Sequence, residues 1–145
     1  MQIQEILEEW KEDAIIDDSK VQDEIYKVSS LHSKYLNYFL YFKQQLSMAE
    51  SKRAKTGFTI KKYYRGELTR EELDKAGLKQ YQGLKMSNTE IQSQFELDPT
   101  MVDLKKIIDD NKIAVQCIEY IMNSIKSRDF TLKNAVEYQK FLAGV

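Results

Sequence analysis

Residues 99–126 read PTMVDLKKIIDDNKIAVQCIEYIMNSIK, and this stretch decides the fold class. Its apolar residues recur at alternating steps of three and four, which is the spacing of one face of a helix. Asp98 is a suitable N-cap, and Pro99 suits the first helical position, where its missing N–H costs nothing. We predict that the heptad residues of this stretch form the contact between copies of the chain. They are Met101, Leu104, Ile108, Asn111, Val115, Ile118, Met122 and Ile125.

The apolar face of this stretch is too wide for a simple two-stranded coil. Ile107, Ala114 and Ile121 add a third apolar column, which favours a bundle of several helices. Asn111 lies on the seam, where a polar side chain fixes the register of packed helices at some cost in stability. The pattern predicts a mainly α-helical protein with a heptad-patterned C-terminal oligomerisation helix.

A second long helix is predicted over residues 19–55, which contain no Gly or Pro and carry an apolar face. Ser19 and Gln22 form a capping-box signature for its start, and Gly57 marks its end. His32 falls on the apolar face of this helix, and we interpret it as a structural residue rather than a ligand.

Two shorter helices are expected near the ends of the chain. One covers residues 131–142, with Thr131 as its cap and Gly144 just beyond its end. The other covers residues 2–12, where the apolar spacing is weaker.

The middle segment, residues 57–98, is the least regular and holds four of the five glycines. Thr69 and Glu72 predict a short capped helix that ends at Gly77, and the alternation over 91–97 predicts a short strand. We interpret the chain as one domain, 1–145, with N-terminal helices over 1–56, this basic middle segment, and oligomerisation helices over 99–145.

The composition excludes several classes of protein. With one Cys and one His in 145 residues, the chain has no intrachain disulfide framework, no thiolate zinc site and no two-histidine metal site. It also lacks a Gly-rich phosphate loop. There is no run of 18 apolar residues and no signal peptide at the acidic N-terminus. We therefore expect a soluble intracellular protein that is not an enzyme and carries neither a metal nor another cofactor.

Charge is strongly segregated along the chain, although the net charge is only -1. Residues 1–24 hold nine acidic and two basic residues, whereas residues 52–65 hold six basic residues and no acid. Phe58, Tyr63 and Tyr64 lie among these bases, and single-stranded nucleic acid binds to such combinations through phosphate neutralisation and base stacking. A solvated basic surface with tyrosines in the core is the competing interpretation. The candidate DNA-binding residues are Lys52, Arg53, Lys55, Lys61, Lys62, Tyr63, Tyr64 and Arg65.

Residues along almost the whole chain resemble the UvsY recombination mediator family of T-even-like bacteriophages. The likeness needs no gap over the first 64 residues, and its strongest part is Ile125-Lys126-Ser127-Arg128 near the C-terminus. The other matching residues are Glu8, Glu9, Lys11, Asp13, Ile16, Asp17, Lys20, Gln22, Glu24, Ser33, Lys34, Leu36, Asn37, Tyr63, Tyr64, Phe130, Lys133, Phe141, Ala143 and Gly144.

This resemblance implies a homo-oligomeric ring, a hexamer or heptamer, that binds single-stranded DNA and has no catalytic activity. It implies two protein partners, a UvsX-like recombinase and the phage single-strand-binding protein, and a location in the cytoplasm of the bacterial host cell. In the family, the basic residues that contact DNA lie a few residues before the double tyrosine, where this chain has Phe58 and Ile60. Two alternatives stay open: a plain single-stranded DNA coat protein, and a helical scaffold or adaptor that binds no nucleic acid.

Overall fold

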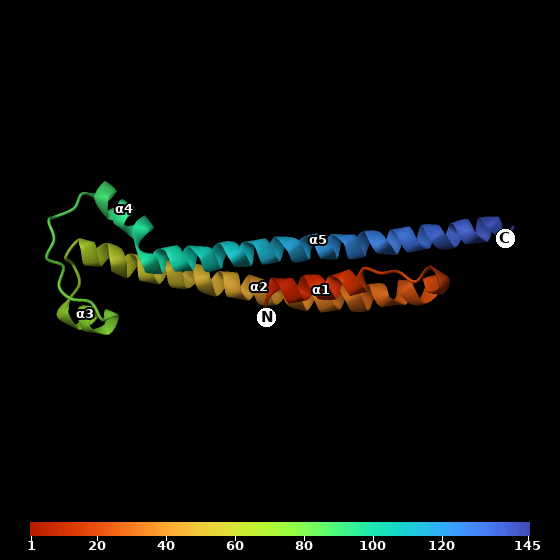
Figure 1. Cartoon of the computed structure of the whole chain (residues 1–145), viewed down its shortest axis with the longest axis horizontal. Helices are drawn as coiled ribbons and strands as arrows, with labels where there is room; N and C mark the ends of the chain where they lie inside the picture. Colours follow the sequence, from red (N-terminus) through yellow and green to blue (C-terminus); the bar gives the residue numbers. More distant parts are fainter. The chain divides into compact units, whose positions relative to one another are not determined.

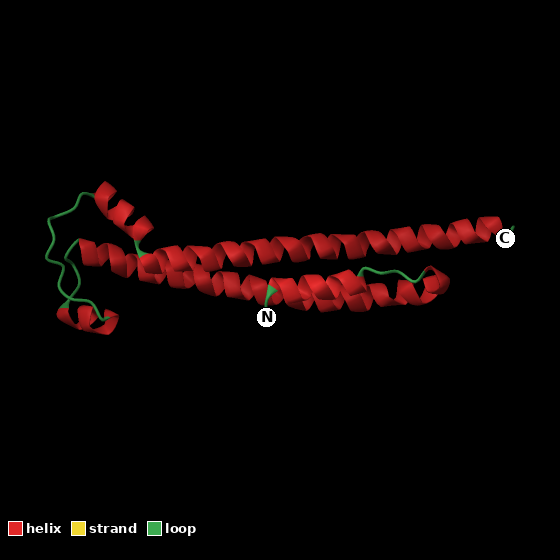
Figure 2. Cartoon of the chain, viewed as in Figure 1, coloured by secondary structure: helices red, strands yellow, loops and turns green.

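The computed structural model describes all residues, 1–145, and every regular element in it is a helix (Figures 1 and 2). The elements are α1 (Ile3–Asp13), a 3-10 turn (Asp18–Lys20), α2 (Val21–Tyr64), α3 (Arg70–Ala76), α4 (Asn88–Leu97) and α5 (Pro99–Leu142). The prediction of a mainly α-helical protein is confirmed. The short strand predicted over 91–97 is wrong, because these residues belong to α4.

The stretches predicted as separate helices, 99–126 and 131–142, form the single helix α5. Thr131 does not cap a new helix: its hydroxyl donates a hydrogen bond to the carbonyl of Ser127, 3.0 Å away, inside α5. No Gly or Pro interrupts the chain between Pro99 and the end of α5, so nothing there breaks the helix.

Both predicted ends of α5 are confirmed. The carboxylate of Asp98 accepts hydrogen bonds from the N–H groups of Thr100 at 2.9 Å and Met101 at 3.3 Å. Gly144 follows the last turn with a φ of 73°, a left-handed conformation that glycine adopts without strain.

The predicted boundaries of the second helix are both wrong. Asp17 caps the 3-10 turn through a 3.0 Å bond from the N–H of Ser19, so α2 begins only at Val21. The helix also continues past Gly57, which is buried against the ring of Phe95 from α4. A Cβ atom at position 57 would lie 2.5 Å from that ring. Gly57 therefore permits a close approach between two helices rather than stopping one.

The short helices of the middle segment are capped by their own side chains. Thr69 accepts a hydrogen bond from the N–H of Glu72 at 3.2 Å, and Gly77 ends α3 with a φ of 66°, so this predicted helix is confirmed. At the start of α4, Ser87 and Glu90 form a reciprocal capping box that the sequence interpretation missed.

The chain divides into two compact units, of which the first comprises residues 1–43 and 112–145. In this unit α1 packs against the first half of α2 and the antiparallel second half of α5 (Figure 1). Tyr35, Ile118 and Ile125 are fully buried at the centre of its core. Burial of these side chains stabilises three helix segments that would not form stably alone.

The second unit comprises residues 44–111, which include α3, α4 and the adjoining halves of α2 and α5. Its interior is smaller and consists of the buried side chains Ala49, Leu68, Leu73, Ile91, Met101, Leu104 and Ile108. The interpretation of residues 1–145 as one domain stays a prediction. No helix in the chain has a stretch long and apolar enough to cross a membrane.

Seven of the eight heptad residues of α5 pack inside the chain itself, and the eighth, Asn111, is half-buried. Val115, Ile118 and Ile125 are buried in the first unit, and Met122 packs partly buried against that core. In the second unit, Met101, Leu104 and Ile108 are buried as well. Asn111 donates its side-chain amide to the carbonyl of Ile107 on the same helix, at 2.8 Å. The assignment of these residues to contact between copies of the chain stays a prediction.

Ionic and phenolic groups hold α1 on α2. Lys34 of α2 donates to the carboxylates of both Asp13 and Glu9, at 2.7 and 2.9 Å. Tyr35 and Tyr38 donate hydroxyl hydrogen bonds to Asp13 and Glu9 respectively, each at 2.8 Å. Burial alone would raise the pKa of Asp13, but the bonds from Lys34 and Tyr35 outweigh it and hold that pKa below its usual range.

Arg128 of α5 closes the same end of α1. Its guanidinium donates to the carbonyls of Asp13 at 3.0 Å and Ala14 at 2.9 Å, and lies 5.5 Å from the centre of the Trp10 ring. The side chain is buried. It thus satisfies carbonyls at the end of α1 that the helix itself leaves without partners.

We expect Arg128→Leu to destabilise the protein by about 1–3 kcal/mol, because two partly buried carbonyls lose a charged donor. Urea unfolding followed by circular dichroism measures this loss. Lys126→Leu is the matched control: Lys126 is exposed on the same helix and should change stability by no more than about 0.5 kcal/mol. Equal effects of the two changes would contradict this role of Arg128.

Candidate nucleic-acid interface

The acid-free basic segment, residues 52–65, lies on the last turns of α2 and just beyond its end. Because a helix turns 100° per residue, its side chains point to opposite sides of α2. Lys52, Lys55 and Arg65 are exposed, whereas the other candidate residues are half-buried, namely Arg53, Lys61, Lys62, Tyr63 and Tyr64. The segment therefore divides into an outer group, in which Lys52, Lys55 and Arg65 are exposed and Lys62 is half-buried on the same side, and an inner group of Arg53, Lys61, Tyr63 and Tyr64.

The outer group presents unpaired positive charge. Lys52, Lys55 and Arg65 form no ion pair, and Lys52 and Lys55 line a shallow hollow along α2 together with Met48. Lys62 lies on the same side, with its ammonium 5.4 Å from the centre of the exposed Phe58 ring and 3.7 Å from the Glu72 carboxylate. A long ion pair of this kind leaves most of the Lys62 charge available to another anion.

The inner group is engaged with α4. The Lys61 ammonium lies 4.7 Å from the centre of the Phe95 ring, and the Arg53 guanidinium lies 5.5 Å from it. Arg53 also approaches the carboxylate of Glu96 at 3.9 Å. These cation–π contacts, with the close approach of Gly57, hold α4 on α2. Two of the basic residues predicted to bind DNA, Arg53 and Lys61, thus stabilise the packing of α4.

Tyr63 and Tyr64 form a three-ring cluster with Tyr81. The ring centres lie 5.2 to 5.7 Å apart with edge-to-face geometry. Burial, and secondarily the charge of Asp98, raises the pKa of Tyr64 above its usual value. The tyrosines thus pack largely against one another. Sequence reasoning missed Tyr81, because it lies in the irregular connection between α3 and α4, where no periodicity marks it.

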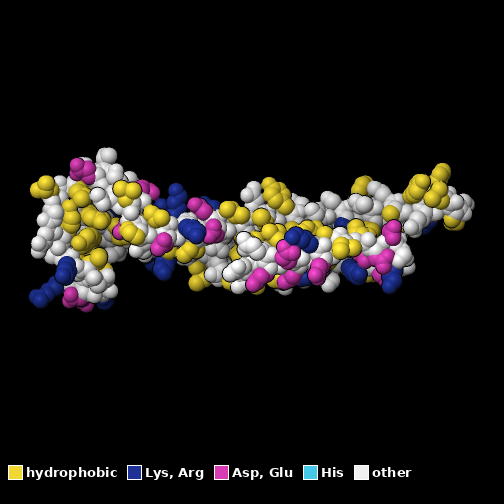
Figure 3. Space-filling model, viewed as in Figure 1, with side chains coloured by type: hydrophobic (Ala, Val, Ile, Leu, Met, Phe, Trp, Pro, Cys, Tyr) yellow, Lys and Arg dark blue, Asp and Glu magenta, His cyan; other side chains and the backbone are white.

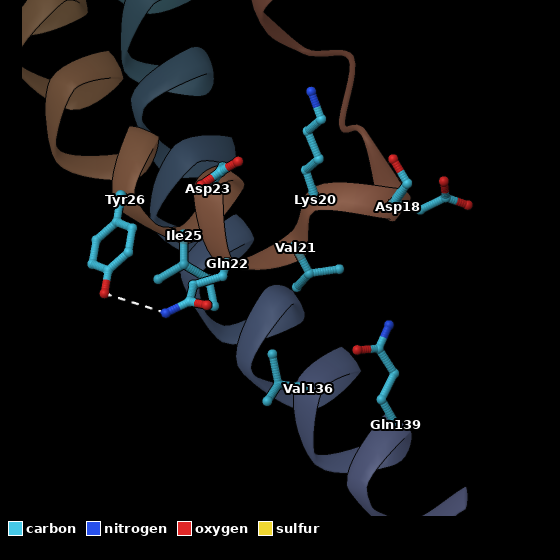
Figure 4. Close-up of a pocket in the computed structure, with 10 residues that line it drawn as sticks. Asp18, Lys20, Val21, Gln22, Asp23, Ile25, Tyr26, Val136 and Gln139 are labelled. Atoms are coloured by element: carbon cyan, nitrogen blue, oxygen red, sulfur yellow. Dashed lines mark hydrogen bonds between the residues drawn. The ribbon is translucent and has the colours of Figure 1, made fainter. Parts of the chain in front are cut away.

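Another hollow lies in the first unit, at the start of α2 (Figure 4). Figure 4 shows residues 18–26 on one side of it and Val136 and Gln139 of α5 on the other, with Gln22 bonded to Tyr26 at 3.5 Å. It contains neither His nor Cys, and no cluster of three or more His, Cys, Asp or Glu side chains that could hold a metal occurs in the chain.

Comparison with known proteins agrees with the helical fold and with the resemblance seen in the sequence. A family model described as "Recombination, repair and ssDNA binding protein UvsY" matches residues 9–145, nearly the whole chain. The chain belongs to the UvsY family. No curated protein sequence matches it.

Solved structures with the same fold come from bacteriophage T4. Three crystal forms of the T4 recombination mediator protein UvsY match with TM-scores of 0.85, 0.81 and 0.77. In the same order, the sequence identities are 22%, 21% and 21%. The aligned parts cover 99%, 97% and 94% of this chain and 98%, 99% and 98% of the T4 chain. At this identity the likeness establishes the fold, and the UvsY family model establishes the relationship.

The division of the basic segment predicts which lysines neutralise a polyanion. We expect Lys52→Gln combined with Lys55→Gln to make the log–log salt slope of oligonucleotide binding shallower by about 1.4, at about 0.7 for each phosphate that is no longer neutralised. Lys61→Gln should leave the slope nearly unchanged and lower stability instead, because Lys61 contacts Phe95. Anisotropy titrations at several salt concentrations test both; a larger slope change for Lys61→Gln would reverse the assignment.

Proposed function

We propose that this protein binds single-stranded DNA through the outer basic side of α2 and mediates the loading of a recombinase. The observation that carries the proposal is unpaired charge on Lys52, Lys55 and Arg65 beside an exposed aromatic ring, in a chain of the UvsY family. Charge without acids nearby attracts phosphates, and an exposed ring suits unpaired bases rather than a closed duplex. The role requires no catalytic group.

The protein acts in this proposal as a homo-oligomeric ring, a hexamer or heptamer. Several basic sides on one ring bind a strand together, so that its avidity exceeds the affinity of one protomer. Exposed apolar side chains gather at the C-terminal end of α5 (Figure 3). They are Phe130, Tyr138, Phe141 and Leu142 of α5, together with Val145 just beyond its end. We assign the contact between copies to these residues, because the heptad residues are already buried within one chain.

The mediator mechanism depends on modest affinity. Only a short part of each chain is acid-free and basic, and Arg53 and Lys61 in it are directed toward α4, so each protomer holds few phosphates. A ring can then loosen the phage single-strand-binding protein by holding the strand at several points. A UvsX-like recombinase displaces the ring in turn, in the cytoplasm of the bacterial host cell.

Stimulation of the cognate recombinase tests this proposal. We expect the protein to raise recombinase ATPase activity on single-stranded DNA coated with the phage single-strand-binding protein, and to do little on bare DNA at low salt. The Lys52→Gln, Lys55→Gln double variant should lose much of the stimulation. Inhibition at every protein and salt concentration would favour the plain coat protein, and failure to bind any oligonucleotide would favour the adaptor.

Ring assembly predicts a decrease in mass on changing exposed apolar residues. Phe141→Glu with Leu142→Glu should convert the oligomer to species near the 17.1 kDa of one chain, with helical circular dichroism retained. Light scattering measures the mass. Tyr26→Glu is the control, since Tyr26 is as exposed as Phe141 but lies on α2. Ile118→Asp should instead unfold the protein, because Ile118 is fully buried.

A further inference from the structure

Phe58 differs from every other aromatic residue of the second unit. Tyr63, Tyr64 and Tyr81 are half-buried in one cluster, and the ring of Phe95 lies under Lys61 and Arg53. Phe58 is 66% exposed and contacts no other ring. Within residues 44–111, Phe58 is thus the aromatic ring most available to a partner.

The surroundings of Phe58 are cationic. Lys55 lies three residues before it and Lys62 four residues after it, so both side chains lie on the same side of α2, one turn away in either direction. The Lys62 ammonium lies 5.4 Å from the centre of the Phe58 ring, and Lys55 forms no ion pair. A single exposed phenylalanine is ordinary, but one with a lysine one helix turn away on either side, in an acid-free segment, is suited to a ligand that is both anionic and flat.

We propose that Phe58 stacks on an unpaired base of the DNA strand while Lys55 and Lys62 bind the phosphates on either side of that base. This inference rests on the proposed binding of single-stranded DNA. It adds the residue that makes the affinity depend on the nucleobases and not only on the phosphates. Charge complementarity favours a nucleic acid strand over an apolar protein helix at this surface, because the Lys62 ammonium lies beside the ring and Lys55 lies one helix turn away.

Each of the three side chains then has a separate measurable effect. Removing a lysine weakens binding and makes the salt slope shallower, because one phosphate fewer is neutralised. Removing the ring weakens binding without changing the salt slope, because no charge is removed. The Tyr63, Tyr64 and Tyr81 cluster positions the end of α2 in this scheme and does not stack on bases.

The test compares two labelled oligonucleotides of equal length and charge, one of thymidines and one of abasic sites. The full-length protein should bind the thymidine strand at least about fivefold more tightly, since one stacked base contributes about 1–3 kcal/mol. Phe58→Leu and Phe58→Ala should both bind the two strands equally, with the affinity that the unaltered protein has for the abasic strand. Phe58→Trp should keep the preference for bases. Circular dichroism checks that each variant is folded.

The outcomes separate this inference from the proposed function. A preference for bases that survives in Phe58→Leu overturns the role of Phe58 and leaves DNA binding in place. Equal binding of both strands by the unaltered protein also overturns it, because phosphates alone then account for the affinity. Binding of neither strand overturns the proposed function, and the role of Phe58 with it.

Discussion

The packing of α5 against α2 around Tyr35 and Ile118 is the interaction on which the first unit depends. Both side chains are fully buried, and the α1 helix is stabilised on the same surface by Lys34, Tyr35 and Arg128. A helix of 11 residues such as α1 is marginal alone in water. The apolar side chains of α5 in this unit therefore stabilise all three helix segments.

The second unit shows how packing determines which charges remain available. Because Gly57 has no side chain, the ring of Phe95 lies directly against α2, and Arg53 and Lys61 form cation–π contacts with this ring. Arg53 and Lys61 are half-buried on the side of α2 that faces α4, whereas Lys52 and Lys55 are exposed on the other side. One segment thus contributes both to the interior of the protein and to its candidate interface. The six basic residues of the segment therefore overstate the number of positive charges that a bound DNA strand would contact.

The sequence predicts the helical class well, because heptad spacing, Asp98 and Thr69 act locally. It fails at Gly57, which ends no helix, because the packing of Phe95 against this residue depends on tertiary contacts. It also fails over 91–97, but there the overlooked signal is local, since Ser87 and Glu90 form the capping box that starts α4. The basic segment could be located from composition. Its division into exposed and engaged bases could not, because the position of Phe95 depends on how α4 packs.

The close packing of Phe95 on Gly57 also has an evolutionary consequence. Any side chain at position 57 would begin with a Cβ atom 2.5 Å from the Phe95 ring, so this ring would have to shift, and with it the contacts that it makes with Lys61 and Arg53. A substitution at position 57 is therefore coupled to the residue at position 95, although the two positions are distant in sequence. Packing of this kind favours paired changes over single ones at these two positions.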